Sequence, residues 1–295
     1  MKVFLTGATG YVGGAVLDAL LRGGHSVTAL VRDSEKAERM RVREVNPTVG
    51  TLGNPRTYRA AAAGCEAVIH TALESSTKTA EIDRTAVDAL LDIKPPVFIY
   101  TSGIWALGAT NSNADEGAST SAPAAISAWR VPHEQRVLDA ATDGHRTIVV
   151  RPGIVYGGSR GIVGDLLRDA ANGLIRVIGS GSNHWPLVYD RDLGDLYVRL
   201  MTTNGASGVY HATDGGAETV SEIVAAIREA VPVRPEVRHV PLDEAHTKMG
   251  VYADALALDQ SVSSPRARAL GWVPTLHSVA GNVPRLFEEW RRGRR

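Results

Sequence analysis

The segment TGATGYVGG at residues 6–14 constrains the fold of this 295-residue chain more than any other segment. It follows a short apolar run typical of a strand and opens a stretch with helical periodicity. Gly7 permits a tight turn, Gly10 lets the backbone approach a pyrophosphate, and Gly13 allows the helix to pack closely on the strand. The segment therefore predicts a dinucleotide-binding turn, with Thr9, Tyr11 and Val12 beside the pyrophosphate.

Short apolar runs alternate with helical patterns through the first half of the chain, which is typical of βαβ units. The expected strands are Lys2–Thr6, Ser26–Val31, Pro47–Thr51, Ala67–Thr71, Val97–Thr101 and Arg146–Val150. The expected helices are Tyr11–Arg22, Ser34–Arg43, Pro55–Ala63, Ala80–Leu91 and Trp129–Ala141. We therefore predict an α/β fold of the Rossmann type, a doubly wound parallel sheet whose ligands lie at the carboxyl ends of the strands.

The alternation loosens after Arg151, where mixed helices and short strands follow. We expect residues 1–150 to form the cofactor-binding domain. Residues 151–295 should form mainly a smaller, mixed substrate-binding region, with segments near 184–212 returning to the first domain. The stretch from Trp105 to Ala125 is rich in Ala, Ser, Asn and Gly, and we expect a mobile surface loop there.

Composition excludes several classes of function. Lys plus Arg and Asp plus Glu are balanced at 32 each, so neither nucleic acid nor an acidic membrane surface is an expected partner. Cys65 is the only cysteine, which rules out a disulfide framework, and no metal site is predicted. The N-terminal apolar run is too short for a signal segment or membrane span, so we expect a cytoplasmic protein. The expected partner is a small-molecule substrate, and a homodimer is one possible assembly.

The end of the second expected strand bears on the choice of cofactor. An acidic residue there would hold the adenosine ribose of NAD, whereas this strand ends in Arg32. A guanidinium binds a 2′-phosphate bidentately and Ser34 adds a hydroxyl, which favours NADP(H) over NAD(H). Asp33 leaves an alternative, since a carboxylate one residue later is still within reach of the ribose.

Taken together, the motifs resemble the short-chain dehydrogenase/reductase superfamily, specifically its extended and atypical branch of NAD(P)-dependent epimerases, dehydratases and reductases. The resemblance covers nearly the whole chain. It rests on TGATGYVGG, EAVIHTA at 66–72, VFIYTSG at 97–103, RPGIVYG at 151–157, HWPLVYDRDLGDLY at 184–197 and RALGWVP at 268–274. These motifs are specific for the fold and the cofactor and much less specific for the reaction.

The resemblance implies further cofactor contacts. Asn54 takes the place of an Asp near adenine, and the end of the fourth strand lines the cofactor. His70 itself is more simply explained as a strand-end histidine whose ring is satisfied by backbone. The residues implied to contact cofactor, besides those already named, are Asn54, Thr71, Ala72, Leu73, His133, Pro152, Gly153, Ile154 and Val155.

The chain departs from this superfamily at the expected catalytic positions. The Tyr-x-x-x-Lys pair is replaced by Trp129 and His133, and the last hydroxyl of a Ser or Thr run is replaced by Gly103, which leaves Ser102. An indole cannot ionise, so Trp129 is at most a pocket wall. We expect His133 on the first exposed turn of its helix, facing a cleft, where it relays a proton or only binds the cofactor. Tyr156 and Tyr189 are alternative proton donors.

The sequence therefore leaves three functions open. The first is an NADP(H)-dependent oxidoreductase acting on a small carbonyl, imine or activated alkene, with the proton from His133, another residue or water. The second is an NADP(H)-binding sensor or scaffold that has lost catalysis. The third, sugar-nucleotide epimerisation or dehydration, is weaker because those reactions depend on the absent tyrosine.

Overall fold

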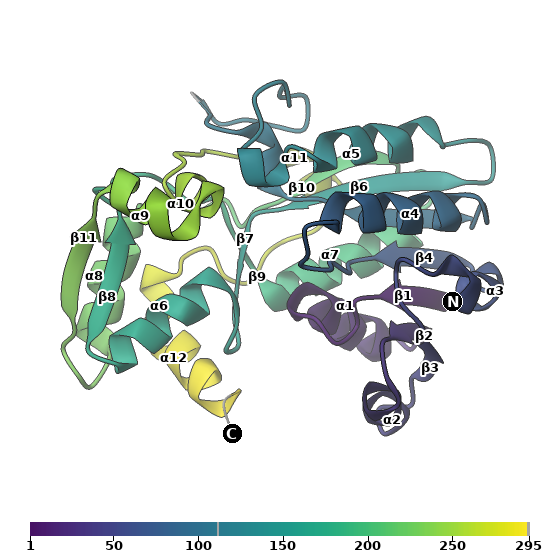
Figure 1. Cartoon of the computed structure of the whole chain (residues 1–295), viewed down its shortest axis with the longest axis horizontal. Coiled ribbons are helices and arrows are strands. Elements are labelled where there is room, and N and C mark those ends of the chain that lie inside the picture. The colour runs from purple at the N-terminus through teal and green to yellow at the C-terminus, as the bar shows by residue number, and fades with distance from the viewer. Residues whose placement is uncertain (111, 294–295) are drawn as a thin grey trace. The chain divides into compact units, whose positions relative to one another are not determined.

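The computed structural model describes residues 1–110 and 112–293 (Figure 1). The chain divides into two compact units, each made of three segments. Unit 1 contains residues 1–102, 129–150 and 193–210. Unit 2 contains residues 103–128, 151–192 and 211–295. Residues 103–128 precede the boundary that we expected at residue 150, yet they pack within unit 2.

A seven-stranded sheet forms the centre of unit 1, with the strand order β10-β6-β5-β4-β1-β2-β3. The pairs from β6 through β3 are parallel, as the alternating pattern predicts. The doubly wound Rossmann-type fold is thereby confirmed. The strands are β1 (Lys2–Thr6), β2 (Ser26–Val31), β3 (Asn46–Val49), β4 (Ala67–His70), β5 (Val97–Thr101), β6 (Arg146–Pro152) and β10 (Gly208–Ala212).

Helices cover both faces of this sheet. Figure 1 shows α4 and α5 along one face and α1 and α7 along the other. Gly194 of α7 lies against the backbone of Ala15 in α1, where an added Cβ would stand 2.5 Å from the Ala15 carbonyl oxygen. The helical segments of unit 1 are α1 (Tyr11–Arg22), α2 (Ser34–Arg41), η1 (Pro55–Thr57), α3 (Arg59–Ala63), α4 (Thr79–Leu91), α5 (Arg130–Asp139) and most of α7 (Asp190–Thr202).

Most predicted elements are confirmed to within two residues at each end, and one of them is divided. The helix expected at Pro55–Ala63 is split into η1 and α3 at Tyr58, which is fully buried and donates its hydroxyl to the Leu52 carbonyl oxygen at 3.1 Å. The third strand spans Asn46–Val49; the Gly50 amide makes one more bond to the Val31 carbonyl oxygen of β2, and the chain turns at Leu52 and Gly53.

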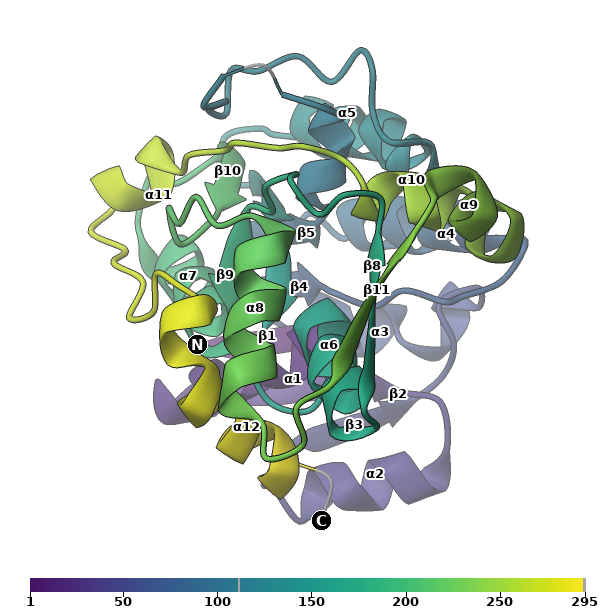
Figure 2. The ribbon, with the colours of Figure 1, turned by 90° about the vertical axis from the view of Figure 1, so that its left-hand side faces the viewer.

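Unit 2 contains two small parallel ladders with helices packed beside them. Strand β8 (Leu174–Ile178) pairs with β11 (Glu236–Val240), and β7 (Ile154–Tyr156) pairs with β9 (Leu187–Tyr189). Figure 2 shows the β8–β11 pair with α6 and α8 beside it. The helical segments are η2 (Ile104–Leu107), η3 (Ala125–Ser127), α6 (Gly161–Ala171), α8 (Val220–Ala230), α9 (Leu242–Met249), α10 (Val251–Leu256), α11 (Pro265–Ala269), η4 (Ala280–Asn282) and α12 (Val283–Arg292).

Described residues of the stretch from Trp105 to Ala125 are bonded to the C-terminal part of unit 2. The buried Gln260 amide donates to the carbonyl oxygens of Ile104 and Gly108, at 3.2 and 2.6 Å. A parallel bridge joins Ala114 to Val262. The polar composition of this stretch suggested a free loop. Its partners lie about 150 residues later in the sequence, at Gln260 and Val262, so a local sequence pattern does not reveal them.

Among the residues that the structure describes, no helix is long and apolar enough to cross a membrane. Within the same residues, no group of three or more His, Cys, Asp and Glu side chains is placed to hold a metal ion.

Candidate functional site

The glycine turn joins the carboxyl end of β1 to α1. Gly7 has a φ of +81°, which favours glycine, and its carbonyl oxygen accepts the Gly10 amide at 2.7 Å. Gly10 caps α1 without a side-chain hydrogen bond, and the first turn carries no acidic residue. A Cβ on Gly13 would overlap the Gly7 carbonyl group. The turn thus presents the positive end of a 12-residue helix, which fits a pyrophosphate.

The residues expected beside the pyrophosphate lie at this turn. Thr9 and Gly10 are exposed, and Tyr11 and Val12 are half-buried on the first turn of α1. The adjoining strand β4 ends directly beside them. The Thr71 hydroxyl donates to the Thr6 carbonyl oxygen at 2.7 Å, and the Ala72 amide donates to the Thr6 hydroxyl at 3.3 Å. A side chain larger than hydrogen is thereby excluded at Gly7, where a Cβ would meet Thr71 and Ala72 at 2.7 Å.

The end of β2 separates the roles of Arg32 and Asp33. The Asp33 carboxylate caps α2, where it accepts the Lys36 amide at 2.8 Å and also pairs with the Lys36 ammonium. These bonds hold the pKa of Asp33 below its ordinary value. Arg32 and Ser34 are exposed, and Arg32 forms no ion pair or hydrogen bond with another residue in the described part of the chain. The carboxylate is therefore occupied, whereas the guanidinium is available to an anion.

Four of the remaining implied contacts of unit 1 lie at exposed or half-buried positions. Leu73 is 53% exposed, and Thr71 and Ala72 are half-buried. Asn54 is exposed at the start of η1, and its side chain does not cap that turn. His70 lies behind them, fully buried, and it is satisfied by side chains instead of by backbone.

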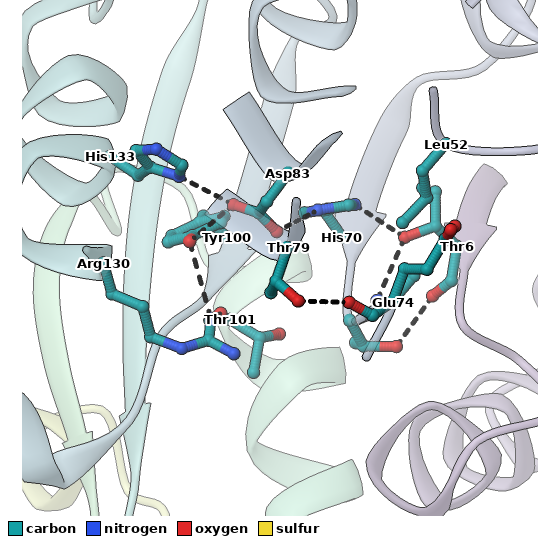
Figure 3. Close-up of polar contacts among 12 residues, drawn as sticks. Thr6, Leu52, His70, Glu74, Thr79, Asp83, Tyr100, Thr101, Arg130 and His133 are labelled. Carbon is teal, nitrogen blue, oxygen red and sulfur yellow. Dashed lines mark hydrogen bonds and ion pairs between the residues drawn. The ribbon is translucent and has the colours of Figure 1, made fainter. Parts of the chain in front are cut away.

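A buried carboxylate on α4 organises the side chains behind this edge of the sheet. Asp83 accepts His133 Nδ1 at 2.8 Å, the Tyr100 hydroxyl at 2.9 Å and His70 Nε2 at 3.2 Å (Figure 3). Burial opposes ionisation, but the hydrogen bonds of His133 and His70 and the charges of His70 and Arg130 hold the pKa of Asp83 well below its usual range. Because an ionised carboxylate only accepts, both rings present an N–H to it.

The placement of His133 corrects one sequence expectation. His133 is 6% exposed instead of lying on an exposed turn, since Asp83 holds its ring against the interior. Helix α5 begins at Arg130, and Trp129 lies just before it, half-buried, with its ring 5.2 Å from that of His133 in an edge-on arrangement. Trp129 and His133 thus contact each other, and His133 also bonds a buried partner that the local sequence does not show.

Ser102 follows β5 and is also turned away from solvent. It is buried, and its hydroxyl donates to the Glu134 carboxylate of α5. The uncertainty about the direction of this side chain is thereby resolved, because the hydroxyl bonds the covering helix.

The last residue of β5 brings together groups that sequence reasoning missed. The Thr101 hydroxyl lies 2.6 Å from the fully buried Tyr197 hydroxyl of α7. The Thr101 carbonyl oxygen accepts Arg130 Nη1 at 2.8 Å. Arg130 lies in the same sequence stretch as Trp129 and His133.

The sequence also carried a signal for Asp83, because Asp83 lies on the apolar face of α4 with Ala86, Val87 and Leu90.

The residues expected after the sixth strand belong to unit 2. Pro152, Gly153 and Ile154 are buried, and Val155 is half-buried. The Gly153 amide donates to the Ala212 carbonyl oxygen at 2.9 Å.

Both tyrosines considered as proton donors are buried and engaged within unit 2. Tyr189 donates its hydroxyl to the Glu289 carboxylate at 2.8 Å. Tyr156 donates to Asp214 at 3.1 Å, and burial together with the Asp214 charge raises the pKa of Tyr156 far above its ordinary value. A phenol in this state does not ionise near neutral pH.

Asp214 predicts a measurable pH dependence of stability. Burial raises its pKa to about 6, although the Gly216 amide and the Tyr156 hydroxyl favour the ionised form. Because the folded pKa is raised, stability is highest below the unfolded value near 3.9 and falls as pH rises to about 6, by up to roughly 3 kcal/mol. Urea unfolding at pH 4.5 and 7.5 should show Asp214→Asn gaining stability over the wild type at the higher pH. An equal difference at both pH values would contradict this assignment.

Comparisons with known proteins agree with this geometry. Residues 7–166, more than half of the chain, match the NAD(P)H-binding family. The uncharacterized protein C2A9.02 of Schizosaccharomyces pombe is 30% identical, over 95% of this chain and 96% of that protein. The 4-hydroxy-2-methyl-3-oxo-4-farnesyl-3,4-dihydroquinoline-1-oxide ketoreductase of Stigmatella aurantiaca is 26% identical, over 83% and 78% of the two chains.

The solved structures show the same fold. The human epimerase family protein SDR39U1, crystallised with NADPH, superposes with a TM-score of 0.79 at 20% identity, covering 98% of this chain and 99% of that one. The glycine turn, the parallel sheet and the family match thus lead to one conclusion: the chain belongs to the NAD(P)H-binding family.

Proposed function

We propose that this protein is an NADP(H)-dependent reductase of a small carbonyl, imine or activated alkene. The observation that carries the proposal is the pair of anion sites at neighbouring strand ends: the glycine turn after β1, and Arg32 after β2, which pairs with no carboxylate of the described residues. The commitment of Asp33 to α2 favours a 2′-phosphate over a free ribose at this position. The reductase chemistry is also supported by the similarity to a ketoreductase.

The residues at the strand ends limit how the reaction proceeds. Bound NADPH supplies a hydride. Trp129 has no ionisable proton, the Ser102 hydroxyl is donated to Glu134, and His133 is tied to Asp83 at the level of Tyr100, one residue before the end of β5. We therefore propose that solvent water supplies the proton that reaches the product. His133 has a positioning role, since it holds Asp83 and packs against Trp129.

Arg32→Ala tests the cofactor assignment. Loss of a charge-assisted bond to the 2′-phosphate should weaken NADPH binding roughly 10- to 100-fold and leave NADH binding unchanged. Arg39→Ala is the control, because Arg39 is an exposed arginine of α2 paired with Glu35. Fluorescence titration with each cofactor measures both affinities. Equal affinities of the wild type for NADH and NADPH would contradict the assignment.

The buried states of Ser102 and His133 also favour a second candidate, a cofactor-binding sensor without turnover. A panel of ketones, imines and enones, followed by NADPH absorbance, separates the two functions. NADPH binding without turnover on any compound would replace the reductase with the sensor.

A further inference from the structure

Among the described residues, Arg130 is the cation that bonds the carboxyl end of β5. Its Nη1 donates to the carbonyl oxygen of Thr101, the last residue of the strand, and lies 3.5 Å from the Tyr100 hydroxyl. Its guanidinium carbon stands 4.4 Å from the centre of the Trp129 ring. A hydrogen bond at one nitrogen and an aromatic face together fix both the position and the plane of the group.

The opposite edge of this guanidinium has no partner within the described residues. Nε and Nη2 donate to none of them, and neither belongs to the buried side-chain nitrogens without a hydrogen bond, so both reach solvent. No carboxylate of the described residues lies within ion-pair distance of Arg130. Arg136, on the same helix, instead pairs with Asp88. The half-buried Arg130 therefore keeps two parallel N–H donors for a ligand.

Neither of the two buried acids near this strand end bonds Arg130, and Glu134 accepts the Ser102 hydroxyl instead. Asp83 attracts Arg130 at longer range, but its oxygens accept His70, His133 and Tyr100. The side edge of Arg130 is thus bonded to no acid of the described part of the chain.

The position of Arg130 separates its ligand from the pyrophosphate. Strand β5 lies two places from β1 in the sheet, with β4 between them. At a strand spacing of about 4.8 Å, this is a lateral step of about 10 Å from the strand that carries the glycine turn. Both strands end at the same edge, where ligands of parallel sheets bind. The group that Arg130 meets is therefore a different one from the phosphates at α1.

We propose that Arg130 binds a carboxylate of the substrate through Nε and Nη2, so that the reducible substrate is an oxo acid or another unsaturated acid. The side edge of a guanidinium matches the two oxygens of a carboxylate. Trp129 and Thr101 hold that edge in place before the ligand arrives, which reduces the entropy lost on binding. The substitution of tryptophan for an ionisable residue thereby gains a role, because the indole supports the guanidinium.

This inference rests on the proposed reductase function, and the test separates the two. Matched 2-oxo and 3-oxo acids and their methyl esters are assayed with NADPH. The wild type should prefer the acids, and Arg130→Gln should raise their KM roughly 10- to 100-fold without changing the KM of the esters or the Kd of NADPH. Arg130→Lys keeps the charge without the bidentate edge and should lie between them. Arg136→Gln is the matched control.

The other outcomes are equally definite. Equal losses on acids and esters, a wild type without acid preference, or a loss confined to NADPH affinity would each overturn the assignment. If no compound is turned over, the reductase proposal fails, but the proposed carboxylate site of Arg130 can still be tested. Calorimetry then measures the binding of oxamate and benzoate in the presence of NADPH. Binding by the wild type that is lost in Arg130→Gln supports the site, and no binding to the wild type overturns it.

Discussion

Replacing Gly13 with alanine is expected to abolish NADPH binding, whereas the same replacement at Gly14 should stabilise the protein. A methyl group on Gly13 would overlap the Gly7 carbonyl group and the Thr71 hydroxyl, so α1 must move away from the turn. Such overpacking costs about 1–3 kcal/mol and displaces the amides that face the phosphates. We expect the affinity for NADPH to fall by at least roughly 100-fold, which corresponds to about 2.7 kcal/mol.

Gly14 provides the control, because it is the next residue of the same helix. Its added Cβ would meet only the Ala8 carbonyl oxygen, at 3.8 Å, an ordinary contact. Alanine should therefore raise the free energy of unfolding by about 0.5–1 kcal/mol through its helix propensity. Fluorescence titration with NADPH and urea unfolding measure both variants. Tight NADPH binding by Gly13→Ala would refute the role of the turn.

Removing the Asp83 carboxylate is expected to destabilise the protein more than any change of a surface charge. Asp83→Ala leaves the N–H groups of His70 and His133 and the Tyr100 hydroxyl without their buried acceptor. Loss of one partner of a buried charged cluster costs about 3–5 kcal/mol. At roughly 2–4 °C per kcal/mol for chains of this size, the Tm should fall by about 10 °C. Differential scanning calorimetry near neutral pH measures this change.

Two further variants serve as controls for the effect of Asp83→Ala on the Tm. Asp88→Ala removes the exposed partner of Arg136 on the same helix and should cost less than about 1 kcal/mol. His133→Ala should lower the Tm by less than Asp83→Ala does, and it should leave the turnover of the remaining folded protein within a fewfold of the wild type. A loss of turnover by roughly 10²–10⁴-fold at an unchanged Tm would instead make His133 a proton relay.

The fold was largely predictable, because it depends on signals that repeat along the chain. Apolar runs fix the strands, and the glycine turn fixes the first crossover, so β1, β2 and β5 have the predicted bounds. The environment of His133 was not predictable in the same way. It depends on Asp83, which is 50 residues away in the sequence and is brought close only by the packing of α4 on α5.

The end of β2 also shows what the sequence could and could not predict. Sequence alone left Arg32 and Asp33 as competing ligands for the ribose, since both follow the strand. The structure separates them because the Asp33 carboxylate caps α2, a local bond that a helix beginning at Ser34 calls for. A hydrogen bond between residues close in sequence, such as the Asp33 cap, can therefore be predicted from the sequence. Bonds between residues far apart in sequence cannot.

The division of each unit into three segments has a consequence for how the molecule is made. The chain passes between the units after residues 102, 128, 150, 192 and 210. A ribosome that has released the first 150 residues has therefore completed neither unit, since unit 1 still lacks 193–210 and unit 2 lacks most of its residues. Both units are therefore completed only late in synthesis. Dividing the gene at any single position also yields neither unit on its own.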